Sequence, residues 1–582
     1  MKTISESVLV APAQNCDSLA GASLATLLGQ WARRLGDEIA LTFLDYRTTS
    51  DGRAVNLTWR ELDDRVSATA LRAAELASPG ERAAIVAGQS VDYVVAFLGA
   101  IRAGLVAVPL FAPTLPGHSG RLAATLADCA PQVVLTTSAI QDEVADFLVG
   151  QGIEVPSVLP VDSLTPVDGA ERAWHRPEPD ELAYLQYTSG STRSPAGVLL
   201  THHNVLANAR QACGAYGVQS GTTSTVSWLP LFHDMGLILG IGAPMFCGVA
   251  SVLMDPIAFL ERPGRWLRAL SASPGAISAA PNFAYAYSAS RVTEDEKSYL
   301  ELSRVVSLIN GSEPVLPATI ARFQEAFGDC GLRPEVHRAS YGLAEATVLV
   351  SVTDEGSPSR QVRFDRDRLA SGAAVPPAGP SAAVTTLVSC GRPVGQRILV
   401  VNPATGVPLP DGAVGEIWVS GPNVGQGYWR RPELSAATFG LASGGWLATG
   451  DLGVLFEEEL YMTGRLKDLV IVDGRNHYPQ DIEQTVEADP SVRPHSAAAF
   501  AVQLDNGEAP VVVLELARQA AVDLPAVVRA LRGVVSIEHG LKLHDVVFLP
   551  PGTVPRTSSG KISRALCRQS YVDGTLTGRR LG

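Results

Sequence analysis

Short apolar runs alternate with longer amphipathic segments along the first half of the chain, and this alternation restricts the folds open to it. The runs at 83–88, 106–111 and 132–138 have the length and composition of buried strands. The segment at 57–77 instead repeats its apolar residues with the period of a helix. Strands that alternate with helices form mainly parallel sheets with helices packed on them. We therefore expect an α/β fold.

Two changes in composition divide the chain. Residues 353–380 are rich in Ser, Pro, Gly and Ala around a charged centre, so we interpret them as an inserted surface loop. The short apolar runs at 397–401 and 415–420 predict a small β-rich subdomain after this insert. A second boundary follows the sequence YMTGR. We expect a large N-terminal domain of several subdomains, residues 1–465, and a small α+β C-terminal domain, residues 466–582.

The acidic balance of the chain argues against several classes of partner. A formal charge of −13 and a pI near 5.3 repel nucleic-acid phosphates, so we expect no nucleic-acid partner. The seven cysteines include no C-x-x-C pair and fit reduced thiols in a cytosol. The apolar run at 93–116 is interrupted by Arg102 and by prolines, which favours a buried helix and strand over a membrane span. We expect a cytoplasmic protein without a membrane span.

A loop rich in Ser, Thr and Gly follows the strand-like segment at 181–186. Hydroxyl groups and closely spaced backbone N–H groups together cradle phosphate oxygens, and here they come from Thr188, Ser189, Gly190, Ser191 and Thr192. We call residues 188–196 the Ser/Thr-rich loop. It is not a Walker A loop, because six residues separate Gly190 from Gly197 and Ala196 precedes the second glycine. Taken alone, the pattern favours an ordinary turn.

Further motifs follow the loop in a set order. They are WLPLFHDMGL (228–237), NGSEPV (310–315), YGLAEAT (341–347), TGD (449–451), GRLKD (464–468) and PRTSSGKISR (555–564). Together with the loop they resemble the adenylate-forming superfamily of acyl-CoA synthetases, nonribosomal adenylation domains and luciferases. The resemblance extends from about residue 20 to the end of the chain.

Within that superfamily the chain most resembles fatty-acyl-AMP ligases, in particular the actinobacterial, mycobacterial-type enzymes that load polyketide synthases. The loop has Arg193 and Ala196 where most acyl-CoA synthetases place Gly and Lys. The segment at 353–380 stands where these ligases carry an insert that hinders a CoA-competent pose. The resemblance implies a large N-terminal adenylation domain and a small, mobile C-terminal domain.

The resemblance also implies a role for each motif residue. Negative charge must be clamped while a carboxylate attacks the α-phosphorus of ATP. Glu345 would bind Mg²⁺, Lys561 would bridge the carboxylate and the α-phosphate, and His233 would orient the carboxylate. Besides the loop, the nucleotide would be bound by Gly311, Ser312, Glu313, Tyr341, Gly342, Asp451 and Arg465, with Tyr341 stacked on adenine and Asp451 bonded to the ribose hydroxyls. Lys467 would be the hinge of the C-terminal domain.

The reaction implied is ATP-dependent activation of a medium- or long-chain fatty acid to an acyl-adenylate, with release of pyrophosphate. The acyl group would then pass to the phosphopantetheine thiol of an acyl carrier protein or a polyketide synthase carrier domain. An apolar substrate tunnel would run past residues 235–245 and 278–287, although ordinary core packing explains these residues equally well.

Two alternatives and one possible docking face remain. A fatty-acyl-CoA synthetase would share the first step, and a catalytically silent binding protein is disfavoured because Glu345, Asp451 and Lys561 are all present. Residues 529–582 carry nine Lys and Arg against three acidic residues. Arg564 and Arg568 could dock an acidic carrier protein, and a solvated charge cluster without a partner fits equally well.

Overall fold

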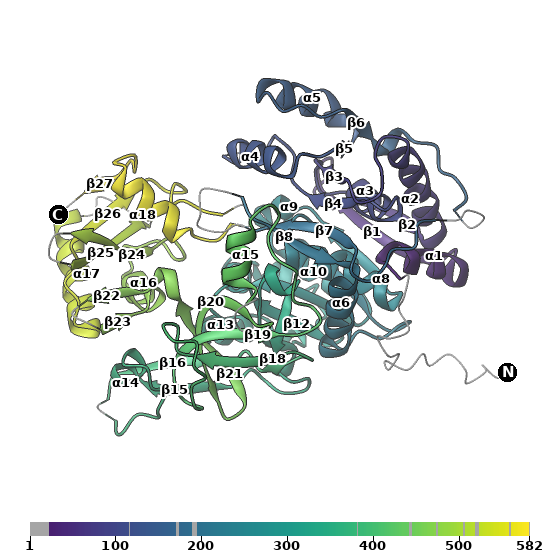
Figure 1. Ribbon diagram of the computed structural model, residues 1–582. Coiled ribbons are helices and arrows are strands. Elements are labelled where there is room, and N and C mark those ends of the chain that lie inside the picture. The colour runs from purple at the N-terminus through teal and green to yellow at the C-terminus, as the bar shows by residue number, and fades with distance from the viewer. Residues whose placement is uncertain are drawn as a thin grey trace.

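The computed structural model describes residues 22–115, 117–169, 174–188, 195–380, 382–440, 445–472, 475–504, 507–517, 523–557 and 560–580. Figure 1 shows a large body built around two sheets, with the C-terminal residues, in yellow, at one side of it. Both sheets belong to the α/β type that the alternating pattern predicts.

The first sheet has six strands, and its last two flank the Ser/Thr-rich loop. Its order is β6 (Ser157–Pro160), β5 (Val133–Thr136), β3 (Arg82–Ile85), β4 (Val106–Pro109), β7 (Leu182–Tyr187) and β8 (Gly197–Thr201). The strands are parallel except for the antiparallel pair β7 and β8. The strands expected at 83–88, 106–111 and 132–138 are confirmed as β3, β4 and β5.

The second sheet has nine strands. Its order is β17 (Arg392–Pro393), β14 (Leu349–Val352), β13 (His337–Gly342), β12 (Ser307–Gly311), β11 (Ala276–Pro281), β9 (Ser224–Ser227), β10 (Ala250–Met254), β1 (Ile39–Asp45) and β2 (Arg53–Thr58). The strands from β13 to β1 pair in parallel, and the outer strands are antiparallel.

Helices connect and cover the two sheets. They are α1 (Leu24–Leu35), α2 (Trp59–Ala74), α3 (Val91–Arg102), α4 (Ser119–Cys129), α5 (Gln141–Gly150), α6 (His202–Tyr216), α7 (Asp234–Leu237), α8 (Ala243–Cys247), α9 (Pro256–Glu261), α10 (Gly264–Ala272), α11 (Asn282–Arg291), α12 (Glu294–Lys297) and α13 (Pro317–Phe327). The helix expected at 57–77 is α2, and its capping box between Thr58 and Glu61 fixes where it begins.

The most apolar helix, α3, lies in the core between the sheets. It contacts β1 of one sheet and β3 and β4 of the other, and all of its residues except Asp92 are buried. Its one buried cation, Arg102, pairs with Asp63 at 2.5 Å and also donates to Ser67. The run at 93–116 is therefore a buried helix followed by a buried strand, as expected. No helix among the described residues is long and apolar enough to cross a membrane.

A smaller antiparallel sheet follows, with the order β18 (Arg397–Val401), β19 (Gly415–Ser420), β20 (Leu447–Phe456) and β21 (Glu459–Arg465). This sheet confirms the β-rich subdomain expected after the insert. The short helix α15 (Pro432–Thr438) lies between β19 and β20.

The insert is not the plain surface loop that its composition suggests. It contains β15 (Gln361–Asp365) and α14 (Arg366–Ala370), and β15 pairs with β16 (Val384–Val388) just beyond it. The Asp365 carboxylate accepts a hydrogen bond from the backbone N–H of Arg368 and so caps α14. Phe364 is fully buried against Phe456 and Tyr461. This packing, which local Ser, Pro and Gly content does not reveal, orders the segment.

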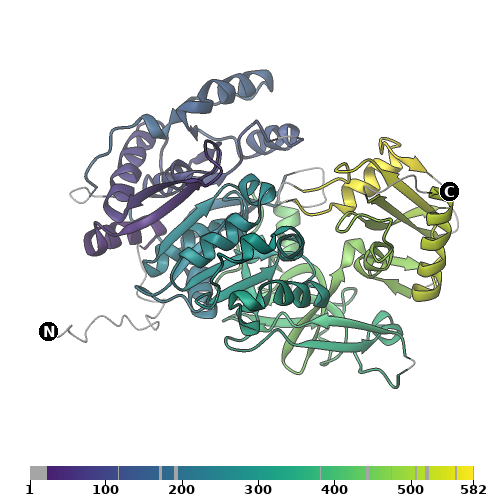
Figure 2. The ribbon, with the colours of Figure 1, turned by 180° about the vertical axis from the view of Figure 1, so that it is seen from behind.

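The C-terminal residues form a compact α+β unit. Its four-stranded sheet has the order β24 (Ala498–Leu504), β25 (Gly507–Glu515), β26 (Asp545–Leu549) and β27 (Arg579–Arg580). The other elements are the hairpin β22 (Val470–Val472) and β23 (Arg475–His477), and the helices α16 (Pro479–Glu487), α17 (Leu524–His539) and α18 (Arg564–Val572). Figure 2 shows, from behind, that this unit adjoins the green segments of the small sheet and the insert.

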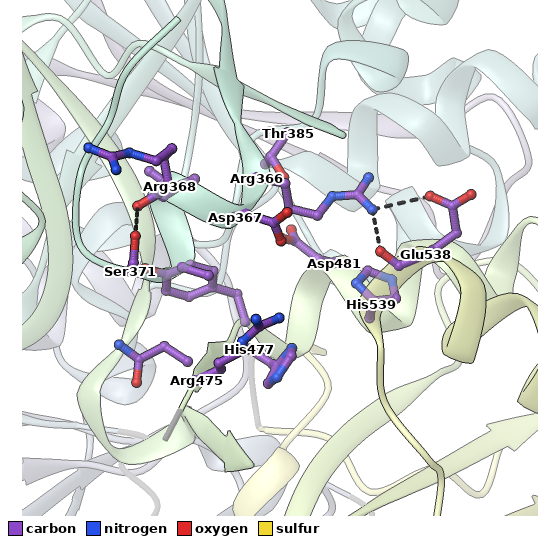
Figure 3. Close-up of a pocket in the computed structure, with 14 residues that line it drawn as sticks. Arg366, Asp367, Arg368, Ser371, Thr385, Arg475, His477, Asp481, Glu538 and His539 are labelled. Atoms are coloured by element: carbon purple, nitrogen blue, oxygen red, sulfur yellow. Dashed lines mark hydrogen bonds and ion pairs between the residues drawn. The ribbon is translucent and has the colours of Figure 1, made fainter. Parts of the chain in front are cut away.

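Residues of the insert and of the C-terminal unit together line a cavity of about 350 Å³. Figure 3 shows Arg366 of α14 reaching across to Glu538 of α17, with His539 and Asp481 beside them. The Arg366 guanidinium donates to the Glu538 backbone carbonyl at 2.8 Å and pairs with its carboxylate at 3.1 Å. The insert therefore touches the C-terminal unit directly in this structure.

Candidate active site

The candidate site begins where two parallel strands of the large sheet end. β12 ends at Gly311 and its neighbour β13 ends at Gly342, and ligands commonly bind at the carboxyl ends of such strands. A Cβ atom on Gly342 would lie 1.8 Å from the backbone oxygen of Val348, so only glycine fits there. This tight turn leads into the short helical turn that carries Glu345.

Tyr341, Asp451 and Arg465 form one connected group beside this edge. The Tyr341 hydroxyl donates to Asp451 Oδ2 at 2.9 Å, and Arg465 Nε lies 3.0 Å from Asp451 Oδ1. Burial and the Asp451 carboxylate both raise the pKa of Tyr341. Each carboxylate oxygen has a second lone pair, so Asp451 can still accept further hydrogen bonds. The structure thus joins three residues that lie in separate motifs.

Glu345 lies next to this group and is held by a residue that the sequence analysis did not single out. Its Oε1 accepts a hydrogen bond from the Tyr428 hydroxyl at 2.7 Å. Burial raises the pKa of Glu345, and the Tyr428 hydroxyl partly opposes this by stabilising the carboxylate. Tyr428 follows a glycine-rich stretch, GPNVGQG, and these glycines are the signal in the sequence that a backbone approaches closely there.

The Glu345 carboxylate fits a hard cation such as Mg²⁺, which prefers oxygen ligands. Among the described residues there is no cluster of three or more His, Cys, Asp or Glu side chains that could hold a metal ion. One carboxylate is nevertheless compatible with Mg²⁺, because this ion is commonly bound by one or two carboxylates together with substrate phosphates.

The Ser/Thr-rich loop starts at the end of β7. The backbone N–H of Thr188 donates to the carbonyl of Ala196 at 3.2 Å, which closes the base of the loop, and Arg121 donates to the Thr188 carbonyl at 3.0 Å. Ser189, Gly190, Ser191 and Thr192, which were expected to cradle phosphate, and Arg193 lie outside the described residues.

His233 stands at the start of α7 and is paired with its neighbour. Its Nδ1 lies 2.5 Å from Asp234 Oδ1, and both side chains are largely buried. Burial alone would raise the pKa of Asp234, but His233 and, further away, Lys561 outweigh it and lower that pKa. The sequence motif at 228–237 contains Asp234 directly after His233, but its pattern alone does not single out Asp234.

Lys561 of the C-terminal unit is electrostatically coupled to two acidic residues of the large body. Burial lowers the pKa of Lys561, while the carboxylates of Asp234 and Glu313 oppose this shift. Glu313 Oε1 accepts a hydrogen bond from the backbone N–H of Phe283 at 2.6 Å. Arg465 also lowers the pKa of Lys561, so the lysine is electrostatically coupled to the Tyr341, Asp451 and Arg465 group as well.

The remaining expected residues occupy the margins of this region. Ser312 follows β12 with φ +68°, and its hydroxyl donates to the sulfur of Met235 at 3.6 Å. Lys467, the expected hinge residue, lies exposed in the turn of residues 466–468 that joins β21 to the C-terminal unit.

The segments at 235–245 and 278–287, where a substrate tunnel was expected, contribute Met245, Tyr285 and other buried side chains to the main core. Arg564 is paired with Asp468 and Glu483.

Comparisons with known proteins identify the family. Residues 28–429 match the family described as AMP-binding enzyme, and residues 467–580 match the Disco-interacting protein 2-like AMP domain. The long-chain-fatty-acid–AMP ligase FadD26 of Mycobacterium marinum is 44% identical over 572 residues, which cover 94% of this chain and 97% of the relative. The corresponding ligase FadD32 of Mycolicibacterium smegmatis is 42% identical and covers 96% of this chain and 95% of its own length.

Solved structures agree with these relatives. A structure from a study of fatty acyl-adenylate ligases of E. coli and L. pneumophila has a TM-score of 0.86 at 33% identity, covering 95% of this chain and 98% of the other. The fatty acyl-adenylate ligase of L. pneumophila in complex with acyl adenylate and pyrophosphate has a TM-score of 0.72 at 31% identity, with 98% of both chains covered. The chain therefore belongs to the AMP-binding enzymes and, within them, to the long-chain-fatty-acid–AMP ligases.

Proposed function

We propose that this enzyme converts a medium- or long-chain fatty acid and ATP into an acyl-adenylate and pyrophosphate. The observation that carries the proposal is the connected group of Tyr341, Asp451 and Arg465 at the sheet edge, beside Glu345, in a chain 44% identical to a fatty-acid–AMP ligase. A fatty acid carboxylate oxygen would form a bond to the α-phosphorus as the bond to the pyrophosphate oxygen breaks.

Each residue of the site would serve this step through its charge or its hydrogen bonds. Asp451 would accept hydrogen bonds from the ribose hydroxyls, Tyr341 would stack on the adenine, and Gly311, Ser312, Glu313, Gly342 and Arg465 would complete the nucleotide site. The ammonium of Lys561 would offset the charge that builds up between the carboxylate and the α-phosphate. His233, oriented by Asp234, would face the attacking carboxylate.

The phosphate groups would be bound from two sides. Residues 188–192 would donate hydroxyl and backbone N–H hydrogen bonds to them, and Glu345 would hold a Mg²⁺ ion against them. The bound ion would neutralise charge on the departing pyrophosphate. With the phosphates bound by the loop and by the ion, Lys561 would be the protein's own cation beside the reacting carboxylate.

In the second step the phosphopantetheine thiol of an acyl carrier protein would attack the acyl carbonyl, with release of AMP. We propose that residues 466–582 move as a unit about Lys467 between the two steps, because the turn at 466–468 joins them to residues 1–465. Hinge motions commonly concentrate in such short element-terminal turns.

One assay tests the proposal and separates it from the CoA synthetase alternative. The enzyme is incubated with ATP, Mg²⁺ and fatty acids of graded length, alone, with CoA, or with a phosphopantetheinylated acyl carrier protein, and the products are identified by mass. We expect acyl-adenylate in every arm and a thioester in the carrier arm. Efficient formation of acyl-CoA would favour the synthetase, and the absence of acyl-adenylate with every acid would refute the proposed function.

The insert offers a second test of the acceptor. If its contact with the C-terminal unit through Arg366 and Glu538 hinders the CoA-competent pose, deletion of residues 353–380 should raise acyl-CoA formation. The substitution Arg366→Met removes the same ion pair without shortening the chain. Unchanged acyl-CoA formation in both variants, with acyl-adenylate formation intact, would show that the insert is not the block.

A further inference from the structure

The segment between β19 and α15 contains a stretch that binds to the side of β8. We call residues 423–431 the bridging segment. Its Gln426 N–H donates to the Leu199 carbonyl at 3.0 Å, and the Leu199 N–H donates back to Gly427 at 2.9 Å. The backbone N–H of Trp429 donates to the Gly197 carbonyl at 2.8 Å. The bridging segment is therefore fixed to the strand by which the chain leaves the Ser/Thr-rich loop.

Close packing against α15 keeps the bridging segment in this position. Gly427 has φ +140°, and a Cβ atom there would lie 2.9 Å from the hydroxyl oxygen of Ser435. That hydroxyl accepts a hydrogen bond from the Tyr428 N–H at 2.8 Å. The Tyr428 ring packs edge-on against Phe439, with centroids 5.2 Å apart. The tyrosine side chain is thus held in one orientation from several sides.

The other edge of the bridging segment holds the turn that contains Glu345. The Gly425 N–H donates to the Glu345 carbonyl at 2.9 Å. The Asn423 side chain donates to the Ala346 carbonyl at 2.7 Å, and the Thr347 hydroxyl donates to the Asn423 carbonyl at 2.8 Å. The hydroxyl of Tyr428 then reaches Glu345 Oε1 at 2.7 Å. Both the backbone and the carboxylate of Glu345 are positioned by this one stretch of chain.

The far end of the bridging segment is linked through Asp128 to the end of β7. Arg431 Nη2 lies 2.7 Å from Asp128 Oδ1, and the hydroxyl of Tyr187 donates to Asp128 Oδ2 at 2.7 Å. Tyr187 is the last residue of β7 and directly precedes Thr188. The bridging segment therefore contacts β8 and the Glu345 turn directly, and it is linked to the end of β7 through Asp128.

We propose that Tyr428 is a positioning residue for the adenylation step, and that the bridging segment holds Glu345 at a set place relative to β8, the strand that follows the Ser/Thr-rich loop. By donating to one oxygen of Glu345, the Tyr428 hydroxyl fixes the carboxylate and leaves its other oxygen to a cation bound with the phosphates. This inference rests on the proposed function for the role of Glu345. It adds a residue that acts through Glu345 and does not itself contact the substrate.

The test is the substitution Tyr428→Phe, which removes the hydroxyl and keeps the ring. Tyr461→Phe is the matched control, because the Tyr461 hydroxyl also donates to a carboxylate, that of Glu459 at 3.0 Å, away from the site. Mn²⁺ binding in the presence of ATP, without fatty acid, is measured by electron paramagnetic resonance. The kcat for pyrophosphate exchange, its Mg²⁺ dependence and the KM for the fatty acid are measured alongside.

We expect Tyr428→Phe to weaken Mn²⁺ binding and lower kcat by about 10-fold, the low end of what losing a hydrogen bond to a charged group costs. The KM for the fatty acid and the melting temperature should stay unchanged, and Tyr461→Phe should behave as the unaltered enzyme. Mn²⁺ binding equal in Tyr428→Phe and the unaltered enzyme would overturn the inference, as would an equal loss in Tyr461→Phe.

The binding measurement also separates the two proposals. If the unaltered enzyme forms no acyl-adenylate with any fatty acid, the proposed function fails, whereas the comparison of Mn²⁺ and ATP binding still decides the role of Tyr428. If acyl-adenylate forms normally but Tyr428→Phe binds Mn²⁺ as tightly as the unaltered enzyme, only the positioning role fails.

Discussion

Arg564 connects three parts of the C-terminal unit, and its removal should destabilise that unit by a predictable amount. At the start of α18 its guanidinium donates twice to Glu483 of α16, at 2.7 and 2.6 Å, and once to Asp468, at 3.2 Å. The Arg564 side chain is 22% exposed, and those of Asp468 and Glu483 are 20% and 14% exposed. Burial lowers the pKa of Arg564, but the two carboxylates outweigh it and raise that pKa.

The substitution Arg564→Met keeps the aliphatic stem and removes the cation. Breaking a buried ion pair from one side costs about 3–5 kcal/mol, because the remaining charge is left unpaired. These side chains keep some contact with solvent, so we expect the lower end, about 3 kcal/mol. For a unit of this size each kcal/mol lowers the melting temperature by about 4 °C, which gives a fall of about 12 °C.

Differential scanning calorimetry of the full chain measures this fall in the transition of the C-terminal unit. Arg568→Met is the control, because Arg568 lies one helical turn further along α18 and is exposed. A melting temperature unchanged in Arg564→Met, or lowered equally in Arg568→Met, would refute the reasoning. The result also bears on carrier docking, since Arg564 is engaged within the unit. Arg568→Glu is therefore the cleaner test, and unchanged carrier loading in that variant would count against docking there.

Three further outcomes can be checked separately. Lys561→Ala should lower pyrophosphate exchange by roughly 100-fold or more, as expected for losing a preorganised charge; near-normal exchange would contradict its role. Lys467→Pro should impair one half-reaction more than the other, because proline restricts the backbone of the turn; equal rates of acyl-adenylate formation and carrier loading would argue against a hinge. Burial raises the pKa of Asp481 to about 6, so the folded state binds more protons than the unfolded state between pH 4 and 6, and stability falls as the pH rises through that window. In urea titrations at pH 7.5, Asp481→Asn should therefore have a free energy of unfolding about 3 kcal/mol above that of the unaltered enzyme, with little gain at pH 4; a gain of the same size at both pH values would exclude titration of Asp481 as the cause.

The insert shows where composition misleads. Its Ser, Pro and Gly content predicts a loop, but Phe364 packs against Phe456 and Tyr461, and the segment forms β15 and α14. Those aromatic partners lie about ninety residues further along the chain. Because local propensity describes only neighbouring residues, it cannot include the free energy gained from such a distant contact.

The local pattern of apolar residues was sufficient to predict several helices and strands of this protein. Apolar periodicity alone predicts the buried strands and α2, because the spacing of side chains on a strand or helix is a property of the backbone itself. The order of the motifs indicates the ligase family without any coordinates. The sequence by itself therefore determined the fold class and the family, whereas the roles of the candidate site residues stay predictions.

Only the tertiary structure decided which of those residues meet. Tyr341 and Asp451 are 110 positions apart, and Glu345 and Tyr428 are 83 apart, yet each pair shares a hydrogen bond. The same holds for Arg564, which a charge count treats as free and which the structure pairs with Glu483, 81 positions away. Such contacts depend on how sheets and loops pack in space, and a hydrogen bond tolerates only a few tenths of an ångström of error in that packing.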